Sequence, residues 1–125
     1  MFSESTLQEL LNFSATDPVV SVYLNTEPSK GNADAHRARL RSLLKEVSLK
    51  QDTEAIEEFF NYSYDWSGRS VAVFSCAPAG FFHFVKLSMP VEDGLTLSEL
   101  PEIKPLLNLM DNFGGYGVVL IDKQN

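Results

Sequence analysis

The chain has 125 residues, of which 44% are hydrophobic and 22% are charged, and its formal net charge is −7. This length and composition predict one globular domain and exclude a disordered chain. No apolar run is long enough to span a membrane, the N-terminus lacks a signal-peptide pattern, and the single cysteine, Cys76, excludes an internal disulfide. We therefore expect a cytoplasmic protein, and its acidity excludes broad coating of nucleic acid.

A short helix and a buried strand are predicted at the start of the chain. The helix is indicated by three leucines at helical spacing, Leu7, Leu10 and Leu11. Asp17-Pro18 ends this helical pattern, because proline disfavours the helical conformation of the residue before it. Val19 to Asn25 is β-branched and aromatic, with apolar side chains on both faces, which predicts an interior strand.

Two helices are predicted after a polar loop, over about residues 33–48 and 52–64, with Asp52 as the N-cap of the second. On a helical wheel, the apolar stripe of the first helix consists of Leu40, Leu43, Leu44 and Val47. The apolar residues of the second helix are Ile56, Phe59 and Phe60. Because both helices need burial on one side, we expect a helical hairpin packed beside the sheet.

Two further strands are predicted over Gly68 to Cys76 and Gly80 to Val91, joined as a hairpin by residues 77–79. Residues 92–100 are predicted to form a loop or an edge strand. The alternation of helices and strands predicts an α/β (α+β) fold: a mixed β-sheet with a helical hairpin and additional short helices packed on it.

The C-terminal part is predicted to hold a helix from Ser98 or Glu99 to about Asp111, with Pro101 in its first turn. Tyr116 to Asp122 is a continuous apolar run typical of a strand that is buried on both faces. Such a strand needs neighbours that this chain does not supply. We therefore expect residues 1–112 to form the domain and 113–125 a linker with the first strand of a truncated domain, through which chains self-associate.

The positive charge of the chain is concentrated between Lys30 and Lys50. Six basic and two acidic residues lie in this segment, so it carries +4 while the remaining residues carry −11. On one flank of the predicted helix, four residues apart, are Arg37, Arg41 and Lys45, and Lys50 lies at the hairpin tip. One interpretation is a docking row for phosphates or an acidic partner. The other is a solvated face that covers the core edge and balances the acidic helix that follows.

Other candidate sites lack the partners that their chemistry requires. His36 and His83 have no third ligand at metal spacing, and Cys76 has no second cysteine. Glu57-Glu58 occupies adjacent helical positions that do not face each other, and Gly114-Gly115 precedes a strand rather than a helix. Nothing assembles a nucleophile, a base and an oxyanion site, so we predict no enzyme activity and no metal or cofactor.

Three segments in order resemble the bacterial and archaeal proteins related to class-1 translation release factors of archaea and eukaryotes. These segments are DPVVSVYLNTEPSKGNADAHRARLRSLLKE, DWSGRSVAVFSC and LPEIKPLLNLMDNFGGYGVVLIDKQN, and the resemblance covers about residues 17–125. In such factors an N-terminal α/β domain reads the codon and a middle domain carries Gly-Gly-Gln. Here residues 48–51 replace the decoding Asn-Ile-Lys-Ser, and Gly114-Gly115 is followed by Tyr116, so no stop-codon or peptide-release role is carried over.

The resemblance implies the non-catalytic N-terminal domain of a translation-associated protein. Together with the +4 segment, it predicts that the basic hairpin contacts the ribosome or ribosomal RNA. The contact residues would be Arg37, Arg41, Lys45 and Lys50. The alternative is a protein-interaction or oligomerisation domain with no nucleic-acid role, in which the basic row is only a solvated face.

Overall fold

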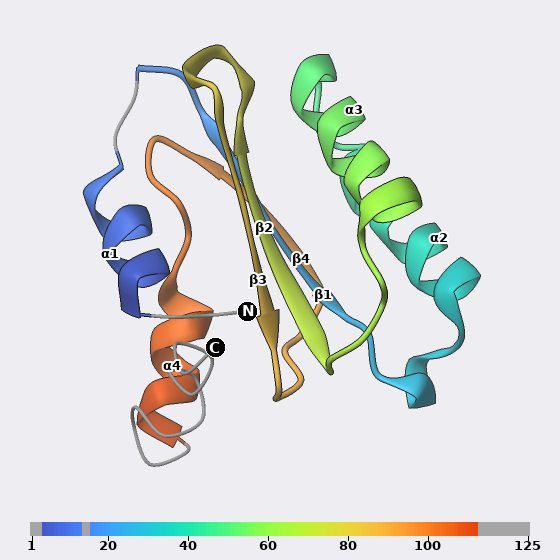
Figure 1. Cartoon of the computed structure of the whole chain (residues 1–125). Coiled ribbons are helices and arrows are strands. Elements are labelled where there is room, and N and C mark those ends of the chain that lie inside the picture. Colours follow the sequence, from blue (N-terminus) through green and yellow to red (C-terminus); the bar gives the residue numbers. More distant parts are fainter. Residues whose placement is uncertain (1–3, 14–15, 113–125) are drawn as a thin grey trace.

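The computed structural model describes residues 4–13 and 16–112, which form one antiparallel sheet with helices on both faces (Figure 1). The strands are β1 (Val19–Asn25), β2 (Ser70–Cys76), β3 (Phe81–Leu87) and β4 (Gly94–Ser98), in the order β3-β2-β1-β4. The helices are α1 (Glu4–Asn12), α2 (Ala33–Leu44), α3 (Lys50–Glu58) and α4 (Lys104–Asn112). α1 and α4 cover one face, and α2 and α3 cover the other. The predicted α/β (α+β) class is confirmed, with a sheet whose described strand pairs are all antiparallel rather than mixed.

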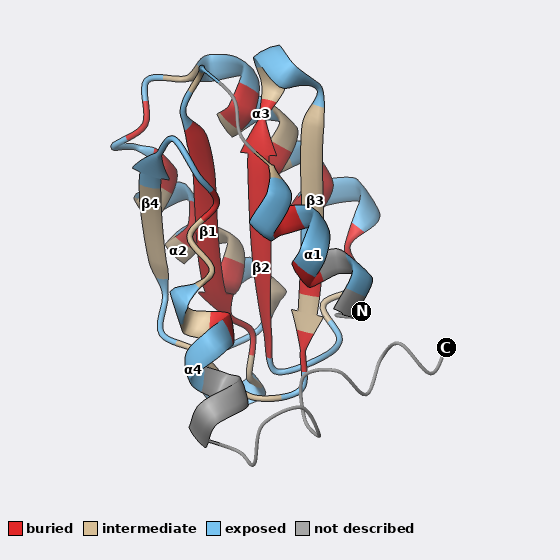
Figure 2. Ribbon diagram, turned by 90° about the vertical axis from the view of Figure 1, so that its left-hand side faces the viewer, coloured by how far each residue is buried: buried red, intermediate tan, exposed pale blue. Residues whose placement is uncertain are grey.

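The central position of β1 explains its apolar sequence. Every residue of β1 is buried, and the strand pairs antiparallel with β2 on one side and β4 on the other. Its side chains alternate between two cores: Val20, Val22 and Leu24 pack under α2 and α3, whereas Val19 and Tyr23 pack toward α1 and α4. Figure 2 shows the buried strands between the two helical layers. The prediction of an interior strand is confirmed.

The helical hairpin is present, but its helices are shorter than predicted. α2 ends at Leu44 rather than near residue 48, because the chain turns there and the N–H of Val47 donates to the Leu44 carbonyl at 3.0 Å. This turn carries Val47 into the core. A π-helical turn, Phe59–Ser63, follows α3. The predicted core residues of both helices are buried or half-buried there: Leu40, Leu43, Leu44, Ile56, Phe59 and Phe60.

Asp52 is not the N-cap of α3, so this prediction is wrong. The helix begins at Lys50, and Leu49 occupies the cap position without a side-chain hydrogen bond. The Asp52 carboxylate instead accepts hydrogen bonds from the Ser75 hydroxyl at 2.5 Å and the Ala77 N–H at 2.8 Å. A tertiary contact with the end of β2 therefore replaces the predicted local contact.

The segment before α4 differs from its prediction for a similar reason. Residues 92–100 contain the edge strand β4, which was one of the two predicted alternatives, and α4 begins at Lys104 rather than at Ser98 or Glu99. The intervening backbone is held by β1, since the Glu102 N–H donates to the Ser21 hydroxyl at 2.9 Å. The Tyr23 hydroxyl donates to the Glu102 carbonyl at 2.5 Å.

Several predictions concern residues 113–125, which lie outside the described part of the chain. They are the domain boundary after residue 112, the Gly114-Gly115 linker, the apolar strand at Tyr116 to Asp122, and self-association through that strand.

Candidate nucleic-acid interface

α2 is a capped helix whose buried residues recur at every fourth position. The Asn32 side chain accepts a hydrogen bond from the Ala35 N–H at 3.0 Å, which satisfies one of the free donors of the first turn. His36, Leu40 and Leu44 form the buried stripe. The residues of the opposite face are therefore directed toward solvent, and the basic side chains lie there or on the two flanks.

Three of the four predicted contact residues are exposed at the end of the hairpin. Arg41 lies in the last turn of α2, Lys45 is its C-cap residue, and Lys50 opens α3. Within residues 4–13 and 16–112, none of the three forms an ion pair, although α3 carries Glu54, Glu57 and Glu58. The solvated-face interpretation requires the acidic helix to neutralise these cations, and α3 does not do so.

Arg37, the fourth predicted contact residue, is engaged by its own chain. Its guanidinium lies 3.0 Å from the Asp34 carboxylate, and its central carbon lies 5.3 Å from the centre of the Trp66 ring. The side chain is only 27% exposed. A cation that is already paired binds phosphate less strongly and releases fewer counterions. Arg37 is therefore a weaker candidate for phosphate contact than Arg41 and Lys45.

Arg39 lies on the opposite flank and fixes α2 to the sheet. Its guanidinium donates to the Asp93 carboxylate at 2.6 Å and to the Asn25 carbonyl at 2.8 Å. Asp93 also accepts a hydrogen bond from the Asn25 N–H at 2.7 Å. The end of β1, the segment before β4 and α2 are therefore joined by one hydrogen-bonded network, which orients the helix that presents the basic residues.

Trp66 holds the other flank of α2. It has a φ of 63°, a left-handed conformation that is strained for a bulky residue. In this conformation its indole stacks on His36, with ring centres 5.6 Å apart, and also contacts Phe60 at 5.3 Å. The indole thus packs between α2 and the aromatic cluster that follows α3, which consists of Phe59, Phe60 and Tyr64. This packing stabilises the hairpin.

The pH dependence of the free energy of unfolding tests whether His36 is buried in the folded protein. Burial, followed by the adjacent Arg39 guanidinium, lowers the pKa of His36. The unfolded chain therefore takes up a proton that the native state resists, so the free energy of unfolding should fall as the pH drops through about 6.5. Urea denaturation between about pH 7.5 and about pH 5.5 measures this dependence. The pH dependence of the free energy of unfolding should weaken in His36→Gln and persist in His83→Gln. Equal pH dependence in the two variants would contradict its assignment to His36.

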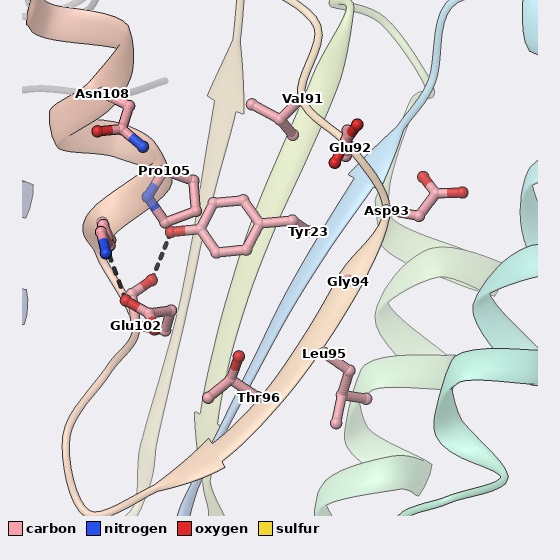
Figure 3. Close-up of a pocket in the computed structure, with 11 residues that line it drawn as sticks. Tyr23, Val91, Glu92, Asp93, Gly94, Leu95, Thr96, Glu102, Pro105 and Asn108 are labelled. Carbon is pink, nitrogen blue, oxygen red and sulfur yellow. Dashed lines mark hydrogen bonds between the residues drawn. The ribbon is translucent and has the colours of Figure 1, made fainter.

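The opposite side of the sheet carries an open pocket of about 670 Å³ between β4 and the start of α4 (Figure 3). Tyr23 forms part of its floor, and burial raises the pKa of its phenol. Glu92, Asp93 and Glu102 line it together with Lys104. Among the described residues that line it, there is no serine, cysteine or histidine that would pair as nucleophile and base, and its carboxylates repel phosphate.

His36 belongs to α2, whereas His83 lies on the other side of the sheet, beside Glu9 of α1. Within the described ranges, no three His, Cys, Asp or Glu side chains are grouped so that they could hold a metal ion. Cys76 is buried.

Comparisons with known proteins add no assignment. No family model and no curated protein matches the chain. Among the described helices, none combines the length and apolar character needed to cross a membrane.

Proposed function

We propose that this domain binds ribosomal RNA through the free end of the α2–α3 hairpin, as the non-catalytic part of a translation-associated, cytoplasmic protein. The observation that carries the proposal is the exposure of Arg41, Lys45 and Lys50 with no carboxylate of the described chain paired to them. The similarity to the N-terminal domains of release-factor-like proteins supports the same function.

The physical argument rests on where positive charge remains available. Arg37, Arg39, Arg69 and Lys86 each pair with a carboxylate, so they contribute little to the field outside the molecule. Arg41 and Lys45 are one helical turn apart, and Lys50 follows across the turn of the hairpin. Such a group can contact successive phosphates and release their counterions, while the acidity of the remaining surface limits binding elsewhere.

The double charge reversal Arg41→Glu/Lys45→Glu tests this proposal. Co-sedimentation with ribosomes over a range of salt concentrations should show weaker binding and a salt dependence reduced by about 0.9 log units per lost phosphate contact. The free energy of unfolding should change by no more than about 1 kcal/mol per side chain, because both residues are exposed.

Lys30→Glu/Lys104→Glu is the matched control. It changes the net charge by the same amount at two exposed residues on other elements, in the turn before α2 and at the start of α4. It should leave ribosome binding nearly unchanged. Equal losses in the two double variants would indicate nonspecific attraction. No loss in either would favour the alternative, a protein-interaction or oligomerisation domain.

A further inference from the structure

The outer edge of β3 is open within the described part of the chain. β3 pairs with β2 and with no other described strand. The Leu87 carbonyl accepts a hydrogen bond from the Arg69 N–H at 3.0 Å, so the backbone of Leu87 faces β2. Because backbone groups alternate along a strand, the N–H and C=O groups of Phe82, Phe84 and Lys86 face the open edge.

This edge lacks the features that usually prevent strand addition. Protected edges carry free lysines, prolines or bulges, whereas β3 reads FFHFVKL. Lys86, its one lysine, is held by its own chain: its ammonium lies 3.1 Å from the Asp65 carboxylate and 5.5 Å from the centre of the Tyr64 ring. Phe84 remains 40% exposed in the middle of the strand.

An aromatic pocket adjoins the edge on the α3 side of the sheet. It measures about 550 Å³ and is lined by Ala55, Glu58, Phe59, Tyr62, Ser63 and Phe82. Phe82 and Phe84 project to this side, since their ring centres lie 5.6 Å and 4.7 Å from that of Phe59. A strand added to β3 would lie about 4.8 Å from it, which places alternate side chains of the new strand beside these rings.

The charges around the edge indicate what else the added strand carries. On the α1 side, Glu9 is 59% exposed and its carboxylate lies 3.6 Å from the His83 imidazole. On the α3 side, Glu58 is exposed at the pocket and forms no ion pair with the described residues. Lysines or arginines of a basic segment would lie beside Glu9, and Glu58 adds negative potential on the other face of the edge, whereas a second copy of a chain with a net charge of −7 is repelled.

We propose that β3 binds a basic, extended polypeptide segment by antiparallel strand addition. Alternate apolar side chains of the segment fill the pocket between Tyr62 and Phe82, and the lysines or arginines between them lie on the side of Glu9. The backbone supplies affinity and the pocket selects the apolar residues, as in other strand-addition complexes. This surface is separate from the basic end of the hairpin, so the proposal does not depend on RNA binding.

The test uses the full chain and a fluorescent peptide, acetyl-Lys-Val-Lys-Phe-Lys-Val-Lys-amide, with binding followed by anisotropy. In an antiparallel hydrogen-bonded pair, opposed residues exchange both bonds and direct their side chains to the same face. The apolar residues of the peptide, which share the face of Phe82 and Phe84, therefore also direct their N–H groups at β3. N-methylation of the valines and phenylalanine should weaken binding about fivefold or more per lost bond, whereas N-methylation of the central lysines should change it little.

Two protein variants test the pocket without altering the edge backbone. Tyr62→Ala should weaken peptide binding several-fold, because Tyr62 is 84% exposed at the pocket and contributes little to folding. Leu107→Ala is the matched control, since Leu107 is 40% exposed on α4, on the other side of the sheet, and should leave binding unchanged. Arg41→Glu/Lys45→Glu should not weaken peptide binding, which separates this proposal from the RNA proposal.

Four results would each overturn the proposal. They are equal binding of the two methylated peptides, no binding of the parent peptide up to about 1 mM, unchanged binding by Tyr62→Ala, and a dimer that dissociates in Phe84→Pro. The last result would show that a second copy occupies the edge.

Discussion

Phe60→Ala should destabilise the domain by about 3–5 kcal/mol, the largest effect that we expect from a single substitution. Phe60 is 1% exposed and is among the largest fully buried side chains. Its ring centre lies 5.0 Å from that of Phe59 and 5.6 Å from that of Tyr64. Removing the ring leaves a cavity between the π-helical turn and the sheet, which cannot close without moving these neighbours.

Urea unfolding followed by the fluorescence of Trp66 measures this effect, because Trp66 is the only tryptophan and its ring lies 5.3 Å from that of Phe60. Tyr62→Ala is the control: it removes an aromatic ring two residues away that is 84% exposed, and it should change the free energy of unfolding by less than about 0.5 kcal/mol. Similar losses in the two variants would show that the aromatic cluster does not pack as described.

The elements that the sequence predicts well are those whose signal is local. β1 is apolar on both faces because it is central, and the hairpin helices carry their buried residues at helical spacing. The boundaries are less predictable where tertiary contacts set them. α4 begins late because β1 holds the backbone of Glu102, a contact between Ser21 and a residue 81 positions along the chain. A local sequence pattern cannot predict a contact between residues so far apart in the chain.

The candidate site divides in the same way. Helical spacing places Arg37, Arg41 and Lys45 on one flank, but it contains no information on which of them is already paired. Trp66 engages Arg37 from a loop beyond α3, through a left-handed backbone conformation that its sequence does not signal. Arg39 binds Asp93, which lies 54 positions away. The orientation of α2 and the availability of its charges therefore follow only from the assembled fold.

Asp52→Ala should lower the free energy of unfolding by about 2–4 kcal/mol, because it leaves two donors at the end of β2 without their acceptor. Asp52 is 2% exposed, and its carboxylate joins α3 to the Ser75 hydroxyl and the Ala77 N–H. This connection holds the first turn of α3, and with it Lys50, against the sheet. Its loss should therefore also weaken RNA binding.

Two substitutions separate the hydrogen bonds of Asp52 from its charge and from helix propensity. Asp52→Asn retains one acceptor oxygen and should recover part of the lost stability, while Glu54→Ala, at an exposed position two residues later in α3, should cost less than about 0.5 kcal/mol. Urea denaturation of the three variants ranks them. If Asp52→Ala is no more destabilising than Glu54→Ala, the buried carboxylate does not hold α3 to the end of β2. The packing of Phe60 against its neighbours would then be what positions Lys50. In that case, Phe60→Ala is the variant that tests whether displacing the end of the hairpin weakens RNA binding.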